Sequence, residues 1–272
     1  MAEGQQDEPE EVESAFELTV EEGQRRLTRT IPALVGTGLA AGVDVSIGVF
    51  ALMLVLHNTD ENLLVGAIAF SFGFVALTLA RSELFTENFL VPIAGMLGTE
   101  HGVYSILRLW TGTAVLNLAG GWVVAALVIS GFPQLRPTAI KLGEHFTELG
   151  IGWRSFAMAM LAGMIITVMT WMVESTRSRG AQIVASAGAG FLLAAAEINH
   201  CIVASLEMFA GLIAGAPYSY LDWLSVFAWA ALGNMVGGVG LVTVIRFVQA
   251  GSSARRAAGG RPPPPREQIE SH

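Results

Sequence analysis

Long apolar runs alternate with short polar stretches along most of this chain. Residues 62–80, 109–135, 155–173 and 223–245 contain no charged side chain. Each run is close to the roughly 20 apolar residues that a helix needs to cross a bilayer. The pattern predicts an all-α integral membrane protein whose six transmembrane helices occupy about residues 31–56, 62–97, 103–130, 153–173, 182–214 and 223–249.

Polar residues interrupt the second and fifth of these segments, which are also too long for a single span. The second is broken at residues 81–88, where Glu83 and Glu87 occur together, and the fifth is broken at Glu197–Cys201. Unwound backbone inside a membrane is tolerated only where it lines a cavity or is buried in protein. Residues 88–97 alone would give about 15 Å of helix, which is too short to cross. We therefore expect a re-entrant half-helix there, in preference to a short loop between two complete helices.

A repeated motif relates the two halves of the chain. The sequence Asn117-Leu-Ala-Gly120-Gly121 recurs as Asn234-Met-Val-Gly237-Gly238, and the same offset moves residues 81–87 onto 198–204, which overlap the second break. Two halves of three spans each must insert with opposite orientation, because three is an odd number. This predicts an inverted 3+3 repeat, in which the paired broken helices form the substrate site near the middle of the bilayer.

Composition and charge agree with a membrane protein and divide the chain into three parts. Hydrophobic residues make up 53 % and charged residues 14 %, a balance that excludes soluble enzymes and nucleic-acid binders. Nine of the 23 acidic residues lie in residues 1–22. We expect an acidic cytoplasmic tail at 1–24, a membrane channel domain at 25–250 and a cytoplasmic tail rich in proline and arginine at 251–272. With both termini inside, 12 basic residues lie inside and three outside, which predicts that both termini are cytoplasmic.

The candidate chemistry is that of a pore and not of an enzyme. No nucleophile–base pair, metal-binding cluster or cofactor motif is present, and Cys201 is the one cysteine. His200 lies in the fifth-segment break between apolar stretches. A histidine at that depth often has a structural role, but the pairing of two breaks favours a place in the pore. Phe70 and Phe74, one helical turn apart, could form a constriction or could simply pack. Half-helices that begin near Asn88 and Cys201 would point backbone N–H groups at the centre and attract anions.

Several of these pieces together resemble the formate/nitrite transporter family over about residues 25–250. They are Phe70-Ser-Phe-Gly-Phe74, Glu83-Leu84-Phe85-Thr86, Asn199-His200 and Gly233-Asn234-Met-Val-Gly237-Gly238. The resemblance implies an aquaporin-like fold, a homopentamer in the lipid of the cell inner membrane, and small monovalent anions such as formate, nitrite or hydrosulfide as solutes. It also implies that the anion is protonated, either by His200 or by bulk water, and crosses the apolar slits as its neutral acid.

The resemblance assigns roles to individual residues. His200 matches the central histidine, Thr86 the loop threonine opposite it, and Leu84 a constriction residue of the same loop. Phe70, Phe74 and Leu193 match positions that line two apolar slits. We also expect Glu83 and Asn199, one from each break, among the residues of the substrate pore.

The sequence also departs from the family pattern. Gly163 stands where the fourth helix usually carries an asparagine, Asn199 replaces a common glutamate, and Lys141 is out of register with the expected vestibule lysine. Two further interpretations therefore remain, a channel for small neutral solutes and a non-conducting membrane protein of the same fold.

Overall fold

The computed structural model describes residues 7–97 and 102–251, and all regular secondary structure in these ranges is helical. Its elements are α1 (Asp7–Leu27), α2 (Ile31–Asn58), α3 (Leu63–Ala80), η1 (Phe85–Phe89), α4 (Val91–Gly95), α5 (Val103–Gly131), η2 (Pro133–Leu135), α6 (Arg136–Leu149), α7 (Trp153–Glu174), α8 (Arg179–Ala195), α9 (Cys201–Ala214), α10 (Tyr220–Met235), η3 (Val236–Thr243) and α11 (Val244–Ala250).

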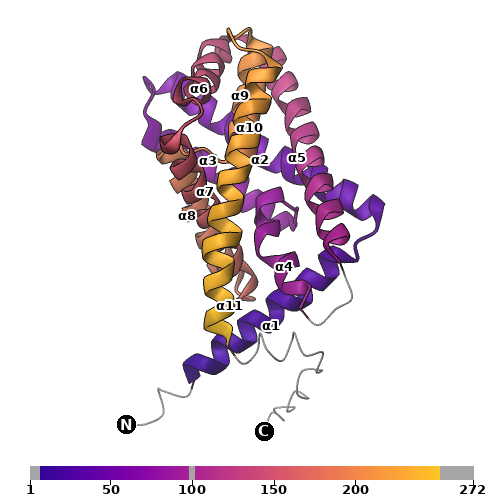
Figure 1. Ribbon diagram of the computed structural model, residues 1–272. Coiled ribbons are helices and arrows are strands. Elements are labelled where there is room, and N and C mark those ends of the chain that lie inside the picture. The colour runs from indigo at the N-terminus through magenta and orange to yellow at the C-terminus, as the bar shows by residue number, and fades with distance from the viewer. Residues whose placement is uncertain (1–6, 98–101, 252–272) are drawn as a thin grey trace.

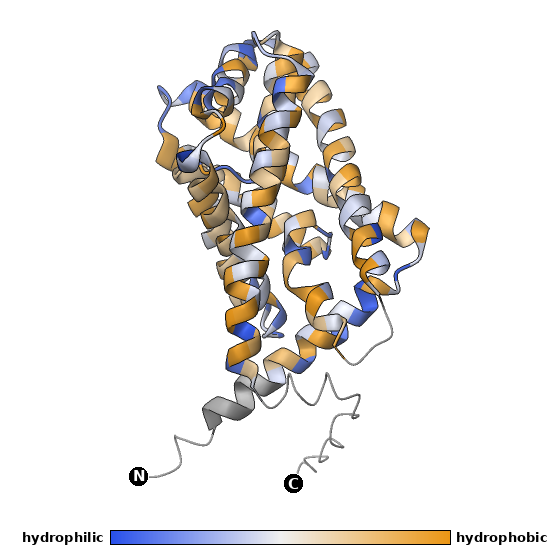
Figure 2. Ribbon diagram, viewed as in Figure 1, coloured by the Kyte–Doolittle hydropathy of each residue, from blue (hydrophilic) through white to orange (hydrophobic). Residues whose placement is uncertain are grey.

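The long helices form an elongated bundle (Figure 1). Helix α2 packs against α3 and α5, and α3 packs in turn against α8. Five helices are long and apolar enough to cross a membrane, namely α2, α3, α5, α7 and the continuous helix Tyr220–Ala250. Apolar residues dominate these helices along their length, whereas hydrophilic residues are frequent on α1 and at the end of the bundle near α6 (Figure 2).

The second and fifth predicted segments are each divided into two helical pieces. Between α3 and η1 the chain is non-helical for only four residues, 81–84, because a 3₁₀-helix begins at Phe85, earlier than expected, and α4 follows it. Between α8 and α9 the non-helical residues are 196–200. Both short pieces, η1 with α4 and α9, lie among the long helices and are almost entirely buried.

Residues 7–24 do not form the solvated tail that their acidity suggested. They belong to α1, which lies across one end of the bundle (Figure 1). Phe16 is fully buried in a cluster with Leu90 and Trp171, and its ring lies 5.5 Å from that of Phe247 in an edge-to-face contact. A count of charges does not detect such a helix, because it overlooks apolar residues that recur on one helical face. Residues 1–6 and 252–272 of the predicted tails lie outside the described part of the chain.

Helix α6 is a second amphipathic element that the segment assignment omitted. It lies at the opposite end of the bundle from α1 and packs on α9 (Figure 1). Its buried side chains, Ala139, Leu142 and Phe146, recur at spacings of three and four, which is the period of a helix with one apolar face.

The last helix widens in its middle. Residues Val236–Thr243 form a π-helical stretch between α10 and α11, without interrupting the helix. This stretch packs beside η1, and the Thr243 hydroxyl donates a hydrogen bond to the Phe89 carbonyl at 2.8 Å. The π-helical stretch therefore anchors the second helical piece of the second segment.

Candidate functional site

His200 and Thr86 meet in the interior, one from each helix break. The His200 Nε2 atom lies 2.8 Å from Thr86 Oγ1, and both residues are fully buried. His200 caps the N-terminus of α9, where its Nδ1 accepts the Val203 backbone N–H at 3.2 Å. Because Nδ1 is an acceptor here, the neutral ring carries its proton on Nε2 and donates it to Thr86. The Thr86 hydroxyl proton is then free to reach another acceptor.

Four apolar residues that the sequence placed in the pore belong to one buried cluster. Phe70 and Phe74 on α3 are fully buried, with ring centroids 5.7 Å apart. Leu84 of the first break and Leu193 of α8 belong to the same cluster. An apolar environment of this kind opposes an unpaired charge and accepts a neutral solute.

Asn117 on α5 holds the first break in place. Its Oδ1 accepts the Phe85 backbone N–H at 2.8 Å, and its Nδ2 donates to the carbonyls of Gly38 at 2.9 Å and Glu83 at 3.0 Å. One buried amide thus satisfies backbone groups at the start of η1 and ties them to α2.

Asn234 makes the corresponding bonds at the second break. Its Oδ1 accepts the Cys201 backbone N–H at 2.9 Å, and its Nδ2 donates to the carbonyls of Ala159 at 2.7 Å and Asn199 at 3.1 Å. Buried backbone groups that no helix satisfies require such partners. Both asparagines are visible in the sequence as a repeated motif, but the motif does not state which backbone groups they reach.

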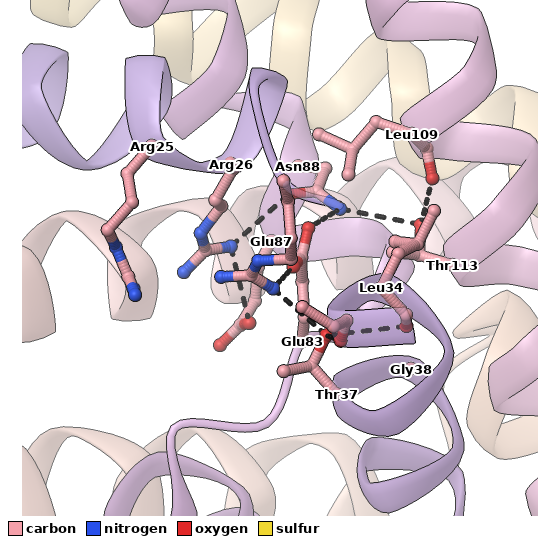
Figure 3. Close-up of polar contacts among 12 residues, drawn as sticks. Arg25, Arg26, Leu34, Thr37, Gly38, Glu83, Glu87, Asn88, Leu109 and Thr113 are labelled. Carbon is pink, nitrogen blue, oxygen red and sulfur yellow. Dashed lines mark hydrogen bonds and ion pairs between the residues drawn. The ribbon is translucent and has the colours of Figure 1, made fainter. Parts of the chain in front are cut away.

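Glu83 forms an ion pair with an arginine in the connection between α1 and α2. It is 1 % exposed and forms an ion pair with Arg29, and it accepts a hydrogen bond from Asn88 Nδ2 at 3.0 Å. Arg29 also donates to the Thr37 hydroxyl at 2.9 Å. Glu83 was predicted as a pore residue, and the structure places it in this network at the α1 end (Figure 3).

Arg26 on α1 is the centre of the same network (Figure 3). It contacts Glu22 at 2.9 Å, Glu174 at 3.2 Å and Glu87 at 3.7 Å, and it donates to Asn88 Oδ1 at 3.2 Å. A single buried guanidinium group therefore joins α1, the first break and the end of α7. Burial raises the pKa of Glu22, but the hydrogen bond from Arg25 and the charge of Arg26 outweigh this, so that its pKa lies below the usual 4.5.

Two cavities open at opposite ends of the bundle. The cavity at the α1 end has a volume of about 710 Å³, and six arginines and five glutamates are among its lining residues. The cavity at the α6 end has a volume of about 440 Å³ and is lined by residues that include Glu61, Lys141, Glu144, His145, Glu148 and Glu197. The cavity at the α6 end is therefore mainly acidic, whereas arginines and glutamates are nearly balanced in the cavity at the α1 end.

Asn199 lies directly before His200 in the second break and is 2 % exposed. Its backbone carbonyl accepts from Asn234, whereas its side-chain oxygen has no hydrogen-bond partner among the described residues. The predicted site residues are thus all buried, and contacts join Thr86 to His200. Within the described ranges no group of three or more His, Cys, Asp or Glu side chains could hold a metal ion.

Comparison with known proteins identifies the family. The sequence profile described as Formate/nitrite transporter matches residues 13–248. The chain belongs to the formate/nitrite transporter family. The match begins within α1, so this helix is part of the family region, which starts before the residue 25 that we expected.

Relatives within the formate/nitrite transporter family are distant in sequence. The inner membrane protein YfdC of Escherichia coli is 26 % identical over 84 % of this chain and 76 % of its own length. The formate channel BtFdhC of Bacillus thuringiensis is 24 % identical, over 85 % of this chain and 92 % of its own. A solved structure of a pentameric formate channel with formate bound superposes with a TM-score of 0.67 at 19 % identity and covers 79 % of this chain and 95 % of that chain. The fold is that of this family of channels.

Proposed function

We propose that this chain forms a channel for small monovalent anions such as formate, which crosses the centre as its neutral acid. Membership of the family and the similarity to a formate channel support this function. The observation that carries it is the 2.8 Å contact between His200 and Thr86, which joins the two helix breaks inside an apolar cluster.

The geometry supports a specific division of work between these two residues. His200 Nε2–H donates to Thr86 Oγ1, which leaves the threonine hydroxyl proton to hydrogen-bond an oxygen of the solute. Protonating Nδ1 would displace the Val203 N–H that it accepts. The ring therefore orients Thr86, and the solute brings its own proton from an aqueous cavity. Passage is proton-linked because a bare anion has a far larger desolvation penalty than its neutral acid between Phe70 and Phe74.

The arrangement in the membrane is part of the same proposal. Six spans in an inverted 3+3 repeat are supported by the matching roles of Asn117 and Asn234, and cytoplasmic termini are supported by the distribution of arginines. Similarity to an inner membrane protein and to a pentameric formate channel supports an inner-membrane location and a homopentamer. Each copy then has its own pore, and exposed apolar side chains such as Ile68, Phe72 and Leu127 face lipid or a neighbouring copy.

Formate flux into proteoliposomes tests this function directly. Wild-type protein is compared with His200→Ala between about pH 5 and about pH 8. We expect wild-type flux to rise as the pH falls, and we expect the substitution to change it. Wild-type protein that carries no formate, nitrite or hydrosulfide anywhere in that range would contradict the proposal. Uptake of uncharged solutes without any pH response would instead indicate a neutral-solute channel.

A further inference from the structure

The cavity at the α6 end has an excess of negative charge. Four glutamates line it, and Lys141 is the one fixed cation among its described lining residues. Lys141 forms an ion pair with Glu61. Glu144, Glu148 and Glu197 have no ion pair in the described part of the chain. An anion that approaches this cavity therefore meets three uncompensated carboxylates.

The carboxylates of this cavity also affect a tyrosine beside it. Glu207 on α9 is 6 % exposed. Tyr218, in the connection after α9, lies near both Glu144 and Glu207. Burial raises the pKa of its hydroxyl, and these two carboxylates raise it further. The negative region thus includes side chains from α6 and the second break.

A second, independent feature of the same break points to a protonated solute. The Asn199 side-chain oxygen is buried without a hydrogen-bond donor among the described residues, two residues after Glu197. A buried acceptor without a donor is unfavourable until a donor reaches it. The O–H group of a neutral acid is such a donor, whereas a carboxylate anion has no proton to offer.

The opposite end has a small excess of positive charge, because six arginines and five glutamates are among the residues that line its cavity. Arg81, Arg177 and Arg179 line the cavity at the α1 end and form no ion pair among the described residues. Anions are attracted to that cavity by unpaired guanidinium groups, which bind carboxylates well. The two ends of the pathway therefore differ in the ionisation state of the solute that each favours.

We propose that the α6-end cavity, here named the acidic mouth, excludes monovalent anions and admits the weak acid in its neutral, protonated form. This inference rests on the proposed function and adds the residues that select the form of the solute, which are Glu144, Glu148 and Glu197. At the α1 end the anion accumulates, and at the α6 end the solute passes only together with its proton. Salt screens charges over about 8 Å at physiological ionic strength, so the exclusion is strongest at low salt.

The test separates the two forms of the solute at one face of the membrane. Formate uptake is measured in vesicles whose α6 end faces outward. Raising the external pH by about one unit together with a tenfold increase in total formate keeps the neutral acid constant and raises the anion about tenfold. We expect wild-type uptake at low salt to stay unchanged. In Glu144→Gln/Glu148→Gln we expect uptake to rise about threefold with the anion, because two repelling charges are gone.

Two further measurements make the result independent of any single variant. Adding an inert salt outside wild-type vesicles should screen the carboxylates, so that wild-type uptake rises with the anion concentration as it does in the double variant. The control variant Glu17→Gln removes an exposed acid from α1, at the opposite end, and should behave as wild type. Wild-type uptake that follows the anion at low salt would overturn the acidic mouth and leave the channel function intact. Wild-type vesicles without formate uptake at any pH would overturn both.

Discussion

Gly163 on α7 packs directly against the backbone of Asn234, and no Cβ atom fits between them. A methyl group there would collide with the Asn234 backbone carbonyl group and Cα. Gly42 on α2 meets the backbone of Asn117 in the same way. Each of the two asparagines thus sits on a helix whose neighbour carries a glycine at the point of contact. The glycine that departs from the family pattern at residue 163 has a packing reason in this chain.

Substitution at Gly163 should therefore disturb the second break. We expect Gly163→Ala to lower the free energy of unfolding by about 1–3 kcal/mol, the usual cost of overpacking, and to reduce formate flux. Thermal unfolding of the detergent-solubilised protein measures the first effect. Gly36→Ala is the control, because a Cβ there meets nothing within 4 Å, and alanine favours a helix by about 1 kcal/mol over glycine. Equal stability of Gly163→Ala and Gly36→Ala would contradict the close packing of Gly163 against Asn234.

The buried pair of Arg29 and Glu83 should be sensitive to the loss of one partner. Arg29→Met leaves the Glu83 carboxylate buried without its counter-charge, which costs about 3–5 kcal/mol. The double variant Arg29→Met/Glu83→Gln removes both charges and should recover most of that stability. Thermal melts of the three proteins form the comparison.

The exposed pair of Lys141 and Glu61 supplies the matched control for this prediction. Both side chains are more than half exposed, and exposed pairs contribute about 0–1 kcal/mol. Lys141→Met should therefore change the melting temperature little. If Lys141→Met and Arg29→Met lowered the melting temperature equally, burial would not determine the cost of breaking an ion pair.

Thr86 should be needed for its hydroxyl and not for its shape. Thr86→Val keeps the branched side chain but leaves His200 Nε2–H buried without an acceptor, at a cost of about 1–3 kcal/mol. We expect formate flux to fall at least about tenfold, which corresponds to about 1.4 kcal/mol. Thr86→Ser retains the hydroxyl and should keep most of the flux. If the valine variant conducts as well as wild type, the pair is not on the pathway.

Acid should loosen α1 through Glu22. The pKa of this carboxyl is lower in the folded protein than its usual 4.5, so its ionised form stabilises the docked helix. This contribution is complete above about pH 4.5 and is lost as the pH falls through the lower folded pKa. Hydrogen exchange of residues 15–20 should accelerate across that acidic range. Glu22→Gln should exchange faster at neutral pH and respond less to acid, whereas an unchanged acid response would exclude Glu22 as the cause.

The sequence located the breaks but not the contacts that stabilise them. Charged residues inside apolar runs mark both interruptions, and the family resemblance named Thr86 and His200 before their contact was seen. The network of Arg26 could not be found in this way, because it joins α1 to residues 62 and 148 positions away. The acidic mouth combines residues from the α2–α3 connection, α6 and the second break, and no local pattern relates them.

The two amphipathic helices, α1 and α6, were not among the predicted segments for a related reason. Hydropathy over long windows detects helices that face lipid, whereas α1 and α6 each have one apolar face and one charged face. Their apolar positions, such as Phe16 and Phe146, are visible in the sequence only when the period of a helix is applied to charged stretches.

The π-helical stretch at Val236–Thr243 also sets the rotational register of the end of the chain. Each π-type bond encloses one residue more than an α-type bond, so the residues that follow are turned about the axis relative to a regular helix. Phe247, which follows the stretch, meets Phe16 of α1 in this turned position. Deleting one residue from the stretch would rotate α11 by about 100°. The docking of the first helix therefore depends on an irregularity in the last one.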